Sequence, residues 1–167
     1  MVFLEFYDVL CTRYELEELA EKFISTGKDL ITGAESIFRH HRSRVLPFFL
    51  ERYQDQPARY LNSGFIIAYK WAYLRMLDHI ADNFVDIYMK RHQRSDQRAM
   101  STFMLHNSRL GLINMDIDSQ QEFCHTHTYV NNPLSLEQIR SYFVHVTWLA
   151  LDVQANAYKR IKEHFLG

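Results

Sequence analysis

Near its start the chain reads Leu4-Glu5-Phe6-Tyr7-Asp8-Val9-Leu10, an apolar run that carries two carboxylates three residues apart. The apolar side chains from residue 2 to residue 6 predict a short buried strand that ends in acids. In open α/β sheets, ligands bind outside the carboxyl ends of strands, where carboxylates can hold a divalent cation. From these residues alone the alternative is a strand end with two solvated acids, since E-x-x-D is a common pattern.

Alternating strand and helix patterns continue along the chain and predict an α/β domain. The expected strands cover residues 2–7, 29–34, 60–68, 110–116, 122–130 and 143–146. The expected helices cover residues 13–24, 46–53 (there only as an alternative to the surface loop that residues 36–60 otherwise predict), 69–84 and 95–105, with a short helix opened by Ser135 and a last one between Leu149 and Phe165. Thr12 and Ser95 are the expected N-caps of the first and fourth of these helices. Gly64, inside a strand, predicts a bulge or a place where a ligand approaches the backbone.

Six segments follow the order and approximate spacing of the motifs of one protein family. They are Glu5-Phe6-Tyr7-Asp8-Val9 (D-x-Y-D-V in the family), Leu30-Ile31-Thr32-Gly33-Ala34-Glu35 (V-F-S-A-E), Arg59-Tyr60-Leu61-Asn62-Ser63-Gly64-Phe65-Ile66 (R-Y-L-N-S-G-x-x-I), Ser95-Asp96-Gln97 (D-D-Q), Ile113-Asn114-Met115-Asp116 with Phe123 (I-x-L-D…F), and Phe143-Val144-His145 (x-V-H-x-N-G). Over residues 5–145 the chain thereby resembles the glycosyltransferase domain of the procollagen lysyl hydroxylase and collagen glucosyl- and galactosyltransferase family.

The resemblance implies a nucleotide-diphospho-sugar transferase fold of the GT-A-like type, with a mixed central sheet flanked by helices. It implies a single domain over residues 1–167. In the family, a β-α-β portion with much of the uridine pocket precedes the metal motif. We therefore expect a fragment or a shortened relative that lacks most of the N-terminal nucleotide-binding half.

The implied reaction is the metal-dependent transfer of glucose or galactose from a UDP-sugar to a hydroxyl group, in the family on collagen. The resemblance also implies Mn²⁺ as the metal, UDP-glucose or UDP-galactose as the donor, a collagen-like or glycoprotein acceptor, and the endoplasmic reticulum or secretory lumen as the location. The residues it assigns are, for the metal, Glu5, Asp8 and His145; for the UDP-sugar, Tyr7, Asn62 and Ser63; and for catalysis, Asp96 and Glu35.

The chain departs from the family's pattern at functional positions. Ser95 replaces the first aspartate of D-D-Q, and Thr147-Trp148 replaces the N-G after the histidine. A second function class is therefore a non-catalytic relative that serves as an interaction or scaffolding module. On the residues alone, Asp96 is either a catalytic carboxylate or a helix-start acid that the helix dipole favours. Glu35 is either a site residue or an ordinary acid at the end of a strand.

Composition gives no global case for other partners. A net charge of −1 and a pI near 6.7 do not favour nucleic acid or an anionic membrane. No run of about 18 apolar residues and no basic-then-apolar leader is visible, so neither a membrane span nor a signal peptide is expected. Cys11 and Cys124 are ordinary thiols or a single bridge. His125 and His127, two apart on a strand, are either a metal chelate or ordinary histidines.

Overall fold

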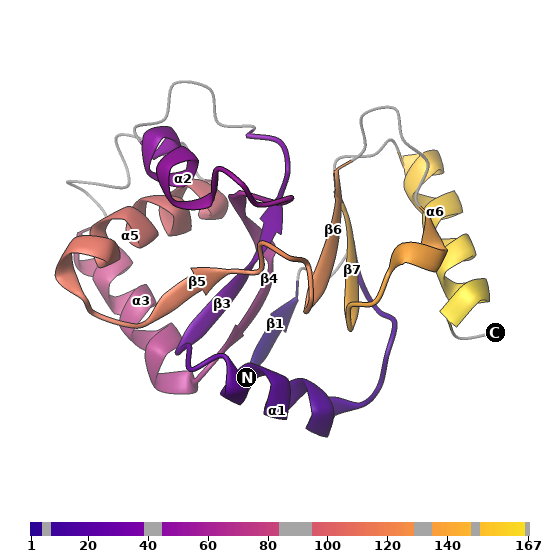
Figure 1. The fold of residues 1–167 in the computed structure, drawn as a ribbon, viewed down its shortest axis with the longest axis horizontal. Helices are drawn as coiled ribbons and strands as arrows, with labels where there is room; N and C mark the ends of the chain where they lie inside the picture. Colours follow the sequence, from indigo (N-terminus) through magenta and orange to yellow (C-terminus); the bar gives the residue numbers. More distant parts are fainter. Residues whose placement is uncertain (5–7, 39–44, 84–94, 129–134, 148–150, 166–167) are drawn as a thin grey trace.

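The computed structural model describes residues 1–4, 8–38, 45–83, 95–128, 135–147 and 151–165 (Figure 1). The strands are β1 Val2–Leu4, β2 Val9–Cys11, β3 Leu30–Glu35, β4 Tyr60–Ala68, β5 Met115–Ile117, β6 Cys124–Thr128 and β7 Phe143–Thr147. The helices are α1 Leu16–Ser25, α2 Leu46–Tyr53, α3 Lys70–Asp82, α5 Asp96–Leu110, the 3₁₀ turn η2 Leu136–Gln138, and α6 Leu151–Phe165. The expected α/β class is confirmed.

The described strands form two mixed sheets, where a single central sheet was expected. The first sheet has the order β1-β4-β3-β5, in which β3 and β5 are parallel and the other pairs are antiparallel. The second has the order β2-β7-β6, in which β6 and β7 are parallel and β2 and β7 antiparallel. The mixture of directions agrees with the prediction, and the division into two sheets does not.

The sheets lie next to each other, with α2, α3 and α5 on the outer side of the first and α6 on the outer side of the second (Figure 1). Three apolar clusters fill the spaces between these layers. One packs Met76 and Phe103 against the first sheet, and one places Ile161 against β7. Between the sheets, the rings of Phe65 and Phe143 have centroids 5.3 Å apart. Among the described residues, no helix combines the length and apolar character that crossing a membrane requires.

The prediction of a buried strand over residues 2–7 is wrong, because the observed strand β1 is largely exposed and lies at the edge of its sheet. β1 is an edge strand, and Val2 and Leu4 are 36% and 42% exposed. The next strand, β2, belongs to the other sheet, where Val9 lies opposite His145. A run of apolar residues indicates only that the segment is buried on average. It does not show that β1 and β2, at the two ends of this run, pair with strands of different sheets.

The bulge that Gly64 predicts is present in β4. Against β3, the pairing passes from Thr32 with Ile66 directly to Gly33 with Asn62, so residues 63–65 have no partner on β3. Extra residues on one strand bend it and redirect its side chains. Phe65 pairs instead with Leu4 on β1, and its side chain enters the core between the sheets.

Of the two alternatives for residues 46–53, a surface loop or a short helix, the structure has the helix, α2. As expected, Ser95 caps α5 by accepting the Arg98 N–H at 3.3 Å. Thr12 is not a cap. Its hydroxyl donates to the Ser141 carbonyl at 2.7 Å, and α1 begins later, at Leu16.

Both cysteines are free thiols, and the sheet explains why. Cys11 and Cys124 both lie opposite Phe143, one on each side of β7. Two strand spacings separate their Cα atoms by about 9.5 Å, beyond the roughly 7 Å that a disulfide allows. Burial raises the pKa of both thiols, so both favour the protonated form.

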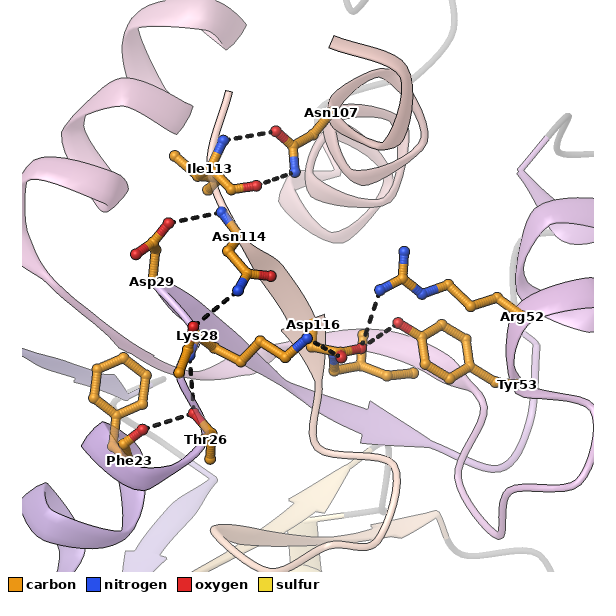
Figure 2. Close-up of polar contacts among 12 residues, drawn as sticks. Phe23, Thr26, Lys28, Asp29, Arg52, Tyr53, Asn107, Ile113, Asn114 and Asp116 are labelled. Atoms are coloured by element: carbon orange, nitrogen blue, oxygen red, sulfur yellow. Dashed lines mark hydrogen bonds and ion pairs between the residues drawn. The ribbon is translucent and has the colours of Figure 1, made fainter. Parts of the chain in front are cut away.

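An ionic cluster around Asp116 ties α2 to the edge strand β5 (Figure 2). Its carboxylate lies 3.0 Å from Lys28 Nζ and 3.7 Å from Arg52 Nη2, and the Tyr53 hydroxyl donates to it. Burial by itself raises the pKa of Asp116, but the hydrogen bonds from Tyr53 and Lys28 outweigh burial, so the pKa is lowered. Asp116 therefore serves the fold as a charged carboxylate.

Two asparagines join the end of α5 to β5 and the first sheet (Figure 2). The Asn107 amide donates to the Ile113 carbonyl at 2.8 Å and accepts the Ile113 N–H at 3.0 Å. The Asn114 N–H donates to Asp29 Oδ2 at 2.7 Å. The side chains of Asn107 and Asp29 thus bind backbone groups of residues 113 and 114, just before β5. These bonds hold the start of β5 in register with β3, its parallel neighbour.

The first prediction concerns α3, where the sequence predicts one core-facing stripe of Tyr73, Met76, Leu77, Ile80 and Phe84, the last of which lies outside the described residues. Met76 is 1% exposed and Ile80 partly buried, whereas Leu77 is 40% exposed. Met76→Ala should lower the free energy of unfolding by about 2–5 kcal/mol, because it leaves a cavity. Leu77→Ala, the matched control, should change it by less than about 0.5 kcal/mol. Urea denaturation measures both, and equal losses would contradict the orientation of α3.

The second prediction concerns pH and Asp116. Its folded-state pKa lies below the unfolded value of about 3.9, so it contributes stability that is present above that pH and lost as pH falls through the folded pKa. Asp116→Asn should therefore be less stable than wild type near about pH 6, and its stability should fall less between about pH 6 and pH 3. Denaturation of both proteins at each pH tests this, and identical pH slopes would refute it.

Candidate functional site

Asp8 and His145 lie side by side, although 137 residues separate them in the sequence. β2 and β7 pair so that Val9 lies opposite His145, and the Val146 N–H donates to the Asp8 carbonyl at 2.8 Å. This register brings Asp8 Oδ2 to 3.1 Å from His145 Nε2. The imidazole is 2% exposed and the aspartate is partly buried. Two of the three residues predicted to bind metal are therefore neighbours.

The imidazole of His145 lies directly against Gly64 of β4. A methyl group at position 64 would lie 2.1 Å from His145 Cε1, 2.5 Å from Nδ1 and 2.7 Å from Nε2. Real Cβ atoms essentially never show contacts under 3.0 Å. The group that approaches Gly64 is therefore a side chain of the protein itself, whereas the sequence had suggested a ligand as one alternative.

A second set of buried polar groups lies at the carboxyl end of β3. Gln97 Nε2 donates to Glu35 Oε1 at 2.6 Å, and Asn62 Nδ2 donates to Gln97 Oε1 at 3.5 Å. The Gly64 N–H donates to Asn62 Oδ1 at 2.9 Å. All three side chains are buried. Glu35 and Asn62, both predicted site residues, thus belong to one hydrogen-bonded chain.

The direction of this hydrogen-bonded chain is fixed at the Gly64 N–H. A backbone N–H can only donate, so the Asn62 oxygen faces it and the Asn62 amino group faces Gln97. Gln97 must then present its oxygen to Asn62 and its amino group to Glu35. The hydrogen-bonded chain therefore ends on Glu35 Oε1 as an acceptor.

The remaining predicted site residues are less closely engaged. Ser63 is partly buried on β4. Asp96 is exposed in the first turn of α5, where its Oδ1 accepts the N–H of Gln97 at 2.7 Å. Glu5 and Tyr7 lie outside the described residues.

The Asp8–His145 pair fits a divalent cation. Asp8 Oδ1 is buried and has no hydrogen-bond partner in the part of the chain that the structure describes. Two ligands about 2.1 Å from one metal, at nearly a right angle, lie about 3 Å apart, close to the spacing of these two side chains. A carboxylate with an imidazole also suits manganese or zinc. Within the described ranges, no group of three or more His, Cys, Asp or Glu side chains is arranged to hold a metal.

His125 and His127 lie apart from this pair. They occupy the face of β6 that continues into Val144 and Val146 of β7, whereas His145 is on the opposite face. Their rings are nearly parallel, with centroids 6.3 Å apart. Burial and then the neighbouring His127 lower the pKa of His125 to about 4. The two histidines therefore do not extend the Asp8–His145 pair.

Sequence reasoning assigned no role to Gln97 and treated Gly64 as a mark of a bulge or of an approaching ligand. Both stand next to predicted site residues in the sequence, Gln97 after Asp96 and Gly64 after Ser63. That adjacency was the available signal, but the contacts with Glu35 and His145 depend on the tertiary fold.

The third prediction concerns Gln97. Gln97→Leu removes the hydrogen bond to Glu35 Oε1 inside the protein, which should cost about 1–3 kcal/mol of unfolding free energy. Gln138→Leu, at an exposed position, is the matched control and should have little effect. If urea denaturation gives the two variants the same stability, the hydrogen-bonded chain does not contribute to the fold.

The sequence of this chain was compared with those of known proteins. No protein-family model matches it, and no curated protein matches it. The chemistry of the candidate site therefore follows from its own residues and their geometry.

Proposed function

We propose that this chain transfers a hexose from a UDP-sugar to a hydroxyl acceptor, with a divalent cation held by Asp8 and His145. The observation that carries the proposal is the 3.1 Å approach of these two side chains from distant parts of the sequence. Their motifs are also the ones that resemble the metal motifs of the collagen-modifying glycosyltransferases. By that resemblance, Glu5 is the third ligand and Mn²⁺ the ion.

The chain's own residues divide the work of the reaction. When bound, the cation acts as a Lewis acid for the charge that develops on the leaving diphosphate. Glu35, held as an acceptor by Gln97, is suited to take a hydrogen bond or proton from the acceptor hydroxyl. By the resemblance, Asp96, which is exposed beside Gln97, lies on the acceptor side with Glu35 and orients that hydroxyl. Tyr7, Asn62 and Ser63 line the donor side by resemblance.

The same resemblance extends the proposal to particular substrates. The donor is UDP-glucose or UDP-galactose, and the acceptor is a collagen-like chain or a glycoprotein. The reaction would then take place in the endoplasmic reticulum or the secretory lumen.

One observation favours the second function class, a non-catalytic interaction or scaffolding module. Ser95 caps α5, and Asp96 Oδ1 accepts a backbone N–H at the start of the same helix. Both positions of the family's D-D-Q acids therefore contribute to helix initiation. Calorimetric titration with UDP and Mn²⁺ separates the two classes, because a module of this kind requires neither.

The fourth prediction tests the cation. A ligand that binds only the folded protein, at about a hundred times its Kd, adds about 2.7 kcal/mol of stability, or roughly 5 °C or more in Tm. Mn²⁺ should produce such a rise in wild type, and Asp8→Ala and His145→Ala should each abolish it.

His125→Ala is the matched control, because His125 faces away from Asp8, and it should retain the rise. A release assay for UDP from UDP-glucose and UDP-galactose then measures turnover. The proposal is wrong if Mn²⁺, with or without UDP, leaves the wild-type Tm unchanged.

A further inference from the structure

Gly64 touches both halves of the candidate site. On one side, its missing side chain leaves the space that the His145 imidazole occupies. On the other side, its N–H donates to Asn62 Oδ1. This bond is the first of the series of hydrogen bonds that continues through Gln97 to Glu35. One residue of β4 therefore connects the Asp8–His145 pair to the carboxylate of β3.

Backbone conformation does not account for a glycine at position 64. Among the described residues, the glycines with positive φ are Gly27 and Gly111, at the ends of α1 and α5. Gly64 is not one of them, so another residue could adopt its backbone angles. Its requirement is spatial, because the polar edge of the imidazole, with Nδ1, Cε1 and Nε2, lies where a Cβ would be.

Among the described residues, neighbours on both adjacent strands confine the His145 side chain. Val9 of β2 and Thr126 of β6 flank it on β7, and all three residues share the face toward the first sheet. The side chain is almost fully buried, so the imidazole could move only by losing its place beside Asp8.

We propose that Gly64 is the positioning residue of the site: by lacking a side chain it sets His145 beside Asp8, and by its N–H it orients the amides that hold Glu35. This inference deepens the proposed function, and only its metal-binding arm rests on that function. Gly64 itself contacts neither substrate nor cation.

A double-mutant cycle without metal tests the positioning. Gly64→Ala should lower Tm strongly when His145 is present, and its Tm shift should be at least three-fold smaller in the His145→Ala background. Gly33→Ala is the matched control, because its Cβ would meet the Asn62 carbonyl at 3.3 Å and not the imidazole. Its Tm shift should be the same in both backgrounds.

Equal Gly64→Ala shifts in the two backgrounds would overturn the proposal. If Gly64→Ala does not fold, the double variant decides. A folded Gly64→Ala/His145→Ala protein supports the proposal, and an unfolded one overturns it, since the glycine would then be required for a reason other than His145.

The metal-binding arm measures free Mn²⁺ by electron paramagnetic resonance. Gly64→Ala should weaken binding at least ten-fold, while Gly33→Ala should leave the affinity near that of wild type. Wild-type affinity in Gly64→Ala would overturn the proposal. If wild type binds no Mn²⁺, the proposed function fails, and the cycle alone then supports or overturns the positioning role.

Discussion

At one point the two sheets approach so closely that only a glycine fits, and the geometry of the candidate site depends on this contact. The β4 bulge presents Gly64 toward β7, and His145 fills the space. Immediately after it, Phe65 meets Phe143 in the apolar core between the sheets. Protein interiors are packed as densely as organic crystals, so a change of one methyl group at such a point is not absorbed. The polar site and the apolar core are therefore fixed by the same segment.

Burying polar groups costs free energy of desolvation, and different buried groups in this fold offset that cost with different partners. A buried polar group without a partner costs about 1–3 kcal/mol, whereas a satisfied hydrogen bond contributes only about 1 kcal/mol net. Glu35, Gln97 and Asn62 meet the cost by bonding to one another and to the Gly64 N–H. Asp116 and Asp118 meet it in other ways: Asp116 through two cations and a tyrosine, and Asp118 by accepting the N–H groups of Glu122, Phe123 and Cys124.

Local signals in the sequence predicted local structure well. The range of β4 and the Ser95 cap follow from periodicity, glycine and capping chemistry, which act over a few residues. The division into two sheets did not follow, because an apolar side chain in β1 carries no information about which strand it will meet. For the site, motif order suggested that Asp8 and His145 would meet, but the hydrogen bond from Gln97 to Glu35 depends on where the start of α5 docks against β3.

Asp8 differs from Asp116 and Asp118, whose carboxylate oxygens both have partners. One of its oxygens faces His145, and the other is buried without a hydrogen-bond partner among the described residues. An unsatisfied carboxylate oxygen inside a protein calls for an explanation, because desolvating a charge is more costly than desolvating a neutral group. Packing alone does not supply one, since an apolar side chain at position 8 would fill the space at lower cost. The proposed cation would supply one, because it would neutralise the carboxylate and take lone pairs from Asp8 and from the imidazole as ligands. Within the described part of the chain, this unpartnered oxygen therefore supports the proposed cation more directly than the contact with His145 does.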